Sequence, residues 1–340
     1  MCAKVAWVWA PHPYPKSFWL EERRDSLQYT VEELAKEHDI LFLASVKKEP
    51  QKIGWMHLYV NPNEAFTALR KFNPDVINLG LFGSGFNRDV AMEFKSSLIT
   101  LYDHGGDLVC SFSDHVDIFF TAQKYRRSLI IQRNKVPPER VILNPYGVNP
   151  KQFYPDDSVE KTYTGIMVGD FRKRKQQHII IVNWSKVMDG KLLLIGRTYP
   201  PLGDPGYARR CRRLIEQLNL SERVKIQDFV PHDELPKIIN SAEIGIHVAQ
   251  GGSATRAVTE MMACGLPMIV LNKYRSNVEW VKDGGLKVEP DSIGTAVNYL
   301  KNNPAKYKEL REAALRTIKP YTYDRMLATF RDVIEEQKKI

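Results

Sequence analysis

Short, continuous runs of apolar residues alternate with amphipathic stretches along most of the chain. The apolar runs typical of buried strands are KVAWVWA (4–10), DILFLAS (39–45), VINLGLF (76–82), SSLITLYDHG (96–105), DHVDIFFTA (114–122), YTGIMVGD (163–170), KLLLIG (191–196), RVKIQDF (223–229), EIGIHVA (243–249) and PMIVL (267–271). Helical patterns cover 18–38, 65–72, 124–136, 175–187, 207–220, 232–242, 255–265, 293–303, 305–318 and 323–339. Strands that alternate with helices in this way predict an α/β protein whose parallel sheet is covered on both faces.

The pattern stops and restarts once. Residues 137–157 are rich in proline, glycine and asparagine, which is typical of a linker. We therefore expect two Rossmann-like domains, an N-terminal one over 1–150 and a C-terminal one over 160–318. Two such sheets in tandem bind ligands at the carboxyl ends of their strands, which predicts a central cleft.

Composition narrows the class of protein. The 340 residues carry a net charge of +9, which points to an anionic partner. Basic residues gather at 124–135, 171–175 and 208–213; the first stretch is the candidate for contact with an anionic membrane, although a helix at the rim of the cleft is the preferred interpretation, and the last is expected to be a solvated face. No apolar stretch is long enough to span a bilayer and no signal peptide is recognised, so a cytoplasmic protein is expected, with peripheral contact at the inner face of a membrane as an option.

Other patterns argue against several kinds of site. The four cysteines lack metal-ligand spacing, and no D-x-D pair is present, so no metal and no cofactor are expected. Nucleic acid is not an expected partner, because no basic sheet with interleaved aromatic residues is found. The stretch GLFGSGF (80–86) lacks a third glycine and a well-placed helix, so a turn is expected there instead of a dinucleotide fingerprint.

The most specific stretch is GGSATRAVTEMMACGLPMIV (251–270). Small residues follow a buried strand and lead into a helix, whose first backbone N–H groups have no partner within the helix and attract phosphate. Glu260 lies one to two turns into that helix, where its carboxylate would reach a sugar hydroxyl beside the phosphates.

This stretch resembles the donor domain of the GT4-type glycosyltransferases, which have the GT-B fold. The resemblance continues in ERVILNPYGVNPKQFYP, GIMVGDFRKRKQQHIII and VKIQDFVPHDELPKIINSA, and in the N-terminal FNPDVINL and TLYDHGG. It implies transfer of a sugar from a nucleotide-diphosphate sugar to the hydroxyl of a glycan, lipid-linked or small-molecule acceptor. In this family the transfer retains the anomeric configuration, and a tail helix, here about 321–340, packs back on the N-terminal domain.

The resemblance also assigns roles to residues. Lys175 falls on the lysine that pairs with the diphosphate, Glu260 on the ribose-binding glutamate and His104 on the histidine that faces the transferred sugar. The remaining candidates bind the donor phosphates: Arg172, the turn of Ser253, Ala254, Thr255 and Arg256, and an N-terminal loop with Lys16 and Ser17.

Two positions depart from the family pattern. Gly252 stands where a glutamate normally contacts the donor sugar, and Asp170 replaces an arginine whose charge Arg172 or Arg174 would supply. The missing glutamate leaves two alternatives open, a non-catalytic subunit that binds a sugar nucleotide and, less favoured, a GT-B sugar-nucleotide epimerase.

Overall fold

The computed structural model describes residues 2–14, 26–46, 50–80, 84–105, 108–200, 202–250 and 256–337. The chain divides into two compact units. The first unit comprises Met1–Gly147 together with Tyr323–Ile340, and the second comprises Val148–Thr322.

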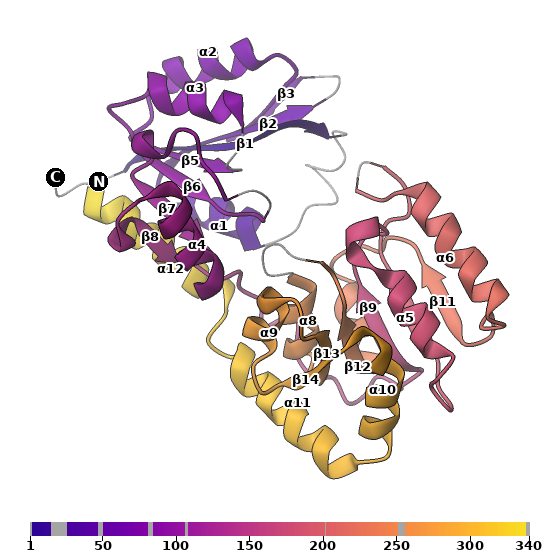
Figure 1. Cartoon of the computed structure of the whole chain (residues 1–340). Helices are drawn as coiled ribbons and strands as arrows, with labels where there is room; N and C mark the ends of the chain where they lie inside the picture. Colours follow the sequence, from indigo (N-terminus) through magenta and orange to yellow (C-terminus); the bar gives the residue numbers. More distant parts are fainter. Residues whose placement is uncertain are drawn as a thin grey trace. The chain divides into compact units, whose positions relative to one another are not determined.

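The first unit is built on an eight-stranded sheet with the strand order β3-β4-β2-β1-β5-β6-β7-β8 (Figure 1). Its strands are β1 (Lys4–Tyr14), β2 (Asp39–Val46), β3 (Gln51–Ile53), β4 (Met56–Tyr59), β5 (Val76–Gly80), β6 (Leu98–Tyr102), β7 (Ile118–Thr121) and β8 (Val141–Leu143). Its helices are α1 (Ser26–Leu34), α2 (Pro62–Phe72), α3 (Gly85–Glu93), α4 (Lys124–Asn134) and α12 (Tyr323–Gln337). Neighbouring strands pair in parallel, except that β3 pairs antiparallel with β4.

Both faces of this sheet are covered, as the alternation of strands and helices predicts. On one face, Ala65 and Leu69 of α2, Val90 of α3 and Ile130 of α4 join a core with the strands. On the other face, the Phe330 ring of α12 lies 4.9 Å from Trp7 and 4.7 Å from Phe120, measured between ring centroids.

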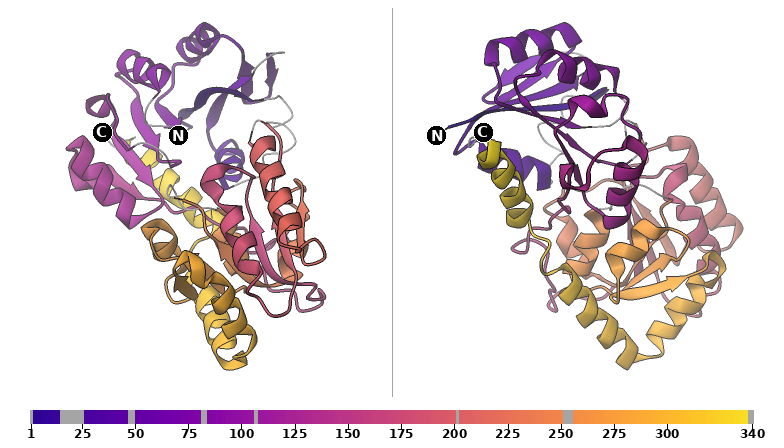
Figure 2. Two further views of the ribbon diagram at one scale, coloured as in Figure 1. Left: turned by 45° about the vertical axis from the view of Figure 1, so that its right-hand side comes forward. Right: turned by 60° about the vertical axis from the view of Figure 1, so that its left-hand side comes forward.

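Helix α12 also packs beside α1, although the two are far apart in the sequence (Figure 2). The Tyr29 hydroxyl of α1 donates to Asp324 Oδ1 at 2.6 Å. The Arg331 guanidinium of α12 pairs with Glu37 just beyond α1. The last helix of the chain is therefore part of the first unit.

The second unit is a six-stranded parallel sheet with the order β11-β10-β9-β12-β13-β14. Its strands are β9 (Tyr163–Val168), β10 (Leu192–Ile195), β11 (Val224–Gln227), β12 (Ala242–His247), β13 (Met268–Leu271) and β14 (Gly285–Val288). Its helices are α5 (Gln177–Trp184), α6 (Pro205–Gln217), α7 (Leu235–Asn240), α8 (Arg256–Ala263), α9 (Arg275–Val281), α10 (Ile293–Lys301) and α11 (Pro304–Ile318). One apolar core joins α5, α6 and α10 to this sheet.

Two local expectations were wrong, and four short elements, β3, β4, α9 and β14, were not predicted. The stretch 137–157 is not all linker, because Val141–Leu143 forms β8 and pairs with β7. A helix does follow GLFGSGF: β5 ends at Gly80 and α3 begins at Gly85, with the Ser84 side chain accepting a hydrogen bond from the Asn87 amide. The short strands β3 and β4 were not predicted, since their half-exposed residues show no clear alternation.

Candidate active site

Lys175 lies just past the carboxyl end of β9, in a 3-10 turn at Lys173–Lys175 that leads into α5. A Cβ atom at Gly169 would lie 3.7 Å from Lys175 Cδ and 3.8 Å from Nζ, so the lysine stem runs alongside this glycine. Part of the Lys175 surface is exposed, but desolvation by the surrounding protein lowers its pKa from 10.5 to about 8. The charged form of a lysine desolvated in this way is stabilised when an anion binds beside it.

The charges around Lys175 are mostly of the same sign. After burial, the charge of Arg174 lowers the Lys175 pKa most, and Arg172 and Arg256 add to it; Asp170 opposes them. Burial and the charge of Arg172 also lower the pKa of Arg174. This cluster of cations, drawn from the turn after β9 and the start of α8, would favour a ligand with several negative charges.

Asp170, which stands in place of the expected arginine, interacts with another residue of the second unit. Its Oδ1 lies 3.8 Å from Arg197 Nη1 and accepts a hydrogen bond from the Arg197 amide at 3.3 Å. Arg197 follows β10, and its guanidinium lies 4.1 Å from the centre of the Phe229 ring. Arg197 therefore brings a further cation to the carboxyl ends of β9, β10 and β11.

His247 at the end of β12 is a residue that the sequence analysis missed. It is fully buried, and burial together with the charge of Lys175 lowers its pKa to about 3. The imidazole is thus neutral at physiological pH and adds no charge next to Lys175. Its position in EIGIHVA looks like one more residue of a buried strand, so only the pairing of β12 with β9 brings it to the site.

Glu260 is in α8, where only 8% of its side chain is exposed. Its Oε1 lies 2.9 Å from His232 Nε2, and the His232 ring in turn packs against Phe153 at 5.1 Å. A carboxylate can accept about four hydrogen bonds, so Glu260 retains capacity for a ligand. Sequence reasoning missed His232, because nothing in the sequence places it 2.9 Å from Glu260.

His104 belongs to the first unit and follows the end of β6. Its Nδ1 lies 2.8 Å from the Tyr146 hydroxyl, and its ring centroid lies 4.4 Å from Trp9 and 4.8 Å from Tyr102. The preceding Asp103 is buried and forms an ion pair with Arg126 Nε at 2.5 Å. His104 is thus a partly exposed side chain on a rigid, buried support.

The other predicted residues are placed only in part. Lys175, Arg172, Arg256 and Glu260 all lie in the second unit, where Arg172 Nε donates to the Leu202 carbonyl. Lys16, Ser17, Ser253, Ala254 and Thr255 lie outside the described residues.

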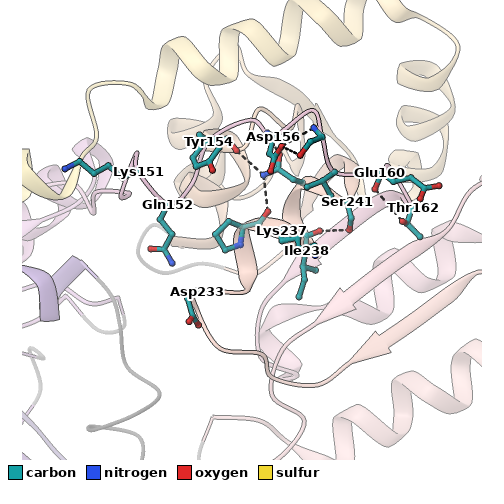
Figure 3. Close-up of a pocket in the computed structure, with 14 residues that line it drawn as sticks. Lys151, Gln152, Tyr154, Asp156, Glu160, Thr162, Asp233, Lys237, Ile238 and Ser241 are labelled. Atoms are coloured by element: carbon teal, nitrogen blue, oxygen red, sulfur yellow. Dashed lines mark hydrogen bonds between the residues drawn. The ribbon is translucent and has the colours of Figure 1, made fainter.

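A separate pocket of about 830 Å³ opens on the second unit (Figure 3). It lies between the segment that precedes β9 and helix α7, and none of the predicted site residues lines it. Its polar groups largely bond to one another: Asn240 accepts from the Asp156 amide at 3.0 Å and donates to the Tyr154 carbonyl at 3.0 Å. We do not assign the chemistry to this pocket.

The two longest basic stretches differ in what their arginines do. In α4, Arg126 is buried against Asp103, and Arg127 donates to the Val141 and Pro138 carbonyls. In α6, by contrast, four arginines are exposed: Arg209, Arg210, Arg212 and Arg213. The charge of Arg212 helps to lower the pKa of Asp228. The exposed basic face is therefore on α6, whereas α4 uses two of its arginines to hold the first unit together.

No helix within the described ranges combines the length and the hydropathy needed to cross a membrane. The same residues contain no group of three or more His, Cys, Asp or Glu side chains placed to hold a metal ion.

Comparison with known proteins shows the family of the chain. Residues 149–317 match the family described as glycosyl transferases group 1. The chain is 24% identical over 265 residues to a probable sucrose-phosphate synthase of Thermosipho melanesiensis, covering 74% of this chain and 57% of that protein. It is 25% identical over 187 residues to the human GDP-Man:Man(3)GlcNAc(2)-PP-Dol alpha-1,2-mannosyltransferase, covering 50% of this chain and 38% of that protein.

The chain belongs to the GT4-type glycosyltransferase family. Its fold is GT-B, two Rossmann-like units built on parallel sheets. The crystal structure of Anabaena HepE in complex with UDP matches it with a TM-score of 0.77 at 13% identity, covering 98% of this chain and 100% of that one. The chain thus spans only 57% and 38% of the lengths of the two curated relatives.

Within this GT4-type chain, the departures from the family pattern can be placed. Asp170 is paired with Arg197, so its negative charge is offset by a cation from the end of the next strand, β10. Gln176, which follows Lys175, adopts φ 60° and ψ 29°, the left-handed conformation that glycine tolerates best. Gly252 lies outside the described residues.

Proposed function

We propose that this protein transfers a sugar from a nucleotide-diphosphate sugar to an acceptor hydroxyl, with retention of configuration and without a metal ion. The observation that carries the proposal is the cluster of cations around Lys175, whose pKa is lowered to about 8 by burial and by neighbouring arginines. An unliganded protein does not gather like charges at strand ends for stability, whereas a departing nucleoside diphosphate needs such charges.

The donor would lie at the carboxyl ends of the second sheet. Lys175 and Arg172 would hold the diphosphate together with the amides of 253–256, and Glu260 would accept hydrogen bonds from the ribose hydroxyls. Arg256 would add charge at the start of α8, where the helix dipole also favours an anion. The loop with Lys16 and Ser17 remains a proposed phosphate contact, as does His104 at the transferred sugar.

The reaction we propose needs no protein nucleophile. The acceptor oxygen bonds to the anomeric carbon on the face from which the phosphate leaves, and the acceptor proton passes to the departing phosphate oxygen. Lys175 and the arginines would stabilise the negative charge that grows on the diphosphate, which is the task that a metal ion performs elsewhere. The acceptor would be a glycan, a lipid-linked glycan or a small molecule, and peripheral contact with an anionic membrane would be made through basic side chains.

The first experiment is a thermal-shift screen with UDP-, GDP-, ADP- and dTDP-sugars. The structural match with a UDP complex and the GDP-mannose named in the human relative make UDP and GDP the first nucleotides to test. A donor that binds the native state at a hundred times its Kd should stabilise it by about 2.7 kcal/mol. Turnover is then measured with candidate acceptors, in the presence and absence of EDTA, and the anomeric configuration of the product is read by NMR.

Lys175→Met tests the proposed diphosphate contact. We expect the donor to bind more weakly by about 2 kcal/mol or more, because one partner of a desolvated charge pair is lost. Lys173→Met is the matched control, since Lys173 is exposed in the same 3-10 turn. Equal donor affinity for wild type and Lys175→Met would contradict the assignment.

Because Gly252 replaces the glutamate that normally contacts the donor sugar, the same experiments also test the two alternative functions. If a donor binds tightly and is neither transferred nor hydrolysed, the protein is a non-catalytic sugar-nucleotide binding subunit. If the donor is consumed without an acceptor and a new sugar nucleotide appears, it is an epimerase.

A further inference from the structure

The carboxylate of Glu260 is held at one of its two oxygens by an imidazole. Glu260 Oε1 lies 2.9 Å from His232 Nε2, and the exposed fractions of the two side chains are 8% and 18%. An ionised carboxylate only accepts hydrogen bonds, so Nε2 carries the proton in this contact. The contact joins α8 to the segment between β11 and α7, and both segments belong to the second unit.

The other oxygen of this carboxylate stays available. Among the described residues, no group bonds to Glu260 Oε2, and this oxygen is not fully buried. It therefore keeps contact with solvent, although the rest of the side chain is covered. A ligand hydroxyl can thus bond to Oε2 while His232 keeps Oε1.

His232 is itself held by a third segment of the chain. Its ring lies 5.1 Å from the ring of Phe153, which is 2% exposed, with an interplanar angle of 54°. Its backbone carbonyl accepts a hydrogen bond from Gln152 Nε2 at 3.1 Å. Phe153 thus restricts the imidazole and Gln152 restricts the backbone, so the direction of Nε2–H is set by the fold.

A glutamate on a fixed helix still has freedom of its own. Residues 258–263 of α8 are all buried, which fixes the backbone at Glu260. The side chain nevertheless has three rotatable bonds, and ordering them when a ligand arrives costs binding free energy. The hydrogen bond to His232 orders these bonds before the ligand binds, and it leaves Oε2 facing one direction.

We propose that His232 is a positioning residue for the ribose: it donates Nε2–H to Glu260 Oε1 and leaves Oε2 as the acceptor for a ribose hydroxyl. The inference rests on the proposed function, in which Glu260 meets the ribose of the donor. It adds that discrimination between ribose and deoxyribose depends on His232. An acceptor that is already oriented gains more from a correctly placed hydroxyl than a mobile one does.

Nucleotide affinities of the full-length chain test the proposal. UDP and GDP are titrated into wild type by calorimetry, and the tighter of the two is compared with its 2′-deoxy and 3′-deoxy analogues. A hydroxyl that bonds to a charged carboxylate accounts for roughly ten- to hundredfold in affinity. We therefore expect at least one analogue to bind wild type more weakly by that factor.

Two substitutions separate the hydrogen bond of His232 from its packing. His232→Phe keeps a ring against Phe153 but has no N–H group, whereas His232→Gln carries an amide N–H that can lie near the position of Nε2. We expect His232→Phe to bind the ribonucleotide about fivefold more weakly and the deoxy analogue almost as tightly as wild type does. His232→Gln should restore most of the lost discrimination.

The ratio of the two affinities distinguishes positioning from a merely structural role. If His232 only held the fold, its loss would weaken the ribonucleotide and the deoxy analogue by the same factor. An unchanged ratio in His232→Phe, or a lowered ratio that His232→Gln does not restore, would overturn the proposal.

His178→Phe is the matched control. It removes another imidazole of the second unit, whose Nδ1 lies 2.9 Å from the Tyr207 hydroxyl and not beside a carboxylate. Its ratio of affinities should equal that of wild type. A lowered ratio in this control would show that the effect is not specific to His232 and would count against the proposal.

The outcomes separate the failure of the inference from the failure of the proposed function. If wild type binds neither nucleotide, the donor site is wrong and the role of His232 falls with it. If discrimination depends on His232 but no sugar is transferred, the inference stands and the transfer is wrong. If sugar is transferred and His232→Phe discriminates as wild type does, the function stands and only the role of His232 is wrong.

Discussion

At the scale of single residues, the candidate site is marked by two groups whose pKa values are shifted. Lys175 and His247 both have lowered pKa values, and each is affected first by burial. The site therefore holds one ammonium group, whose charged form burial disfavours, beside one neutral imidazole. A bound diphosphate would raise the pKa of Lys175, because its negative charge favours the protonated ammonium.

This situation gives donor binding a pH dependence. With a pKa of about 8, Lys175 is protonated below pH 8 in the unliganded protein and loses its charge as the pH rises through 8. The bound diphosphate raises that pKa, so above pH 8 the donor Kd should rise by about tenfold per pH unit until the pKa of the complex is reached. Calorimetric titration from pH 6.5 to 9.5 measures it, and Lys175→Met should give a flat profile.

The same shift acts on stability with the opposite sign. The unfolded chain keeps the lysine proton up to pH 10.5, whereas the folded protein releases it near pH 8. The unfolded state therefore binds more protons between these values, and Lys175 contributes stability that rises with pH across that window. A profile of donor affinity that does not change between pH 7 and 9 would contradict this interpretation of Lys175.

Gln176 is a residue whose backbone conformation can be tested. It has φ 60°, and its side-chain Oε1 accepts a hydrogen bond from the Tyr274 hydroxyl at 2.9 Å. Gln176→Ala and Gln176→Gly both lose this bond, but only glycine removes the steric cost of the left-handed backbone. The glycine variant should thus be more stable than the alanine variant by about 1 kcal/mol in urea unfolding. Equal stabilities would mean that the turn imposes no such cost.

At the scale of elements, the site depends on how closely strand ends approach one another. The turn after β9 passes directly over the end of β10: a Cβ atom at Gly196 would lie 2.3 Å from the Gly169 carbonyl oxygen and 2.8 Å from the Asp170 amide. The local sequence KLLLIG does not predict this contact. It arises because β9 and β10 pair in register, with Ile195 opposite Val168.

Gly196→Ala should therefore disturb both the fold and the site. The added methyl group must push the Gly169–Asp170 backbone away, which we expect to cost about 1–3 kcal/mol in stability and to weaken donor binding by displacing Lys175. Gly85→Ala is the control, because a Cβ atom at Gly85 meets nothing within 4 Å. Urea unfolding and donor titration check both variants, and unchanged donor affinity in Gly196→Ala would argue against this coupling.

At the scale of the whole molecule, the chain builds two cores and closes the first with its last helix. Phe330 of α12 is 3% exposed and packs on Trp7 of β1, near the other end of the chain, and on Phe120 of β7, next to the edge strand β8. Its ring also lies 6.0 Å from Tyr102, which stacks on His104. The C-terminal helix therefore supports the residue proposed to contact the sugar.

Phe330→Ala should destabilise the first unit by about 3–5 kcal/mol, the usual cost of such a cavity. Differential scanning calorimetry should show a lower transition temperature for that unit, while the nucleotide-induced shift of the second unit remains. Asp332→Ala, an exposed substitution in the same helix, should change neither. Loss of nucleotide binding in Phe330→Ala would contradict the assignment of the nucleotide to the second unit.

The sequence by itself determined the alternation of strands and helices, the GT-B fold and the family, because buried parallel strands are continuous apolar runs and the motif around Glu260 is specific. It did not predict β3, β4 or α3, whose residues lack a strong period, nor the short elements α9 and β14. It took β8 for linker because prolines flank three strand residues. Whether Lys175, Glu260 and His104 bind substrate remains a prediction.

Only the tertiary structure decided what stands next to these residues. Tyr146 meets His104, His232 meets Glu260 and Arg197 meets Asp170 across separations of 42, 28 and 27 positions. No local pattern encodes such partners, because they depend on which strands pair and where their ends lie. The sequence names the chemical groups, and the pairing of strands and packing of helices set their charges, orientations and pKa values.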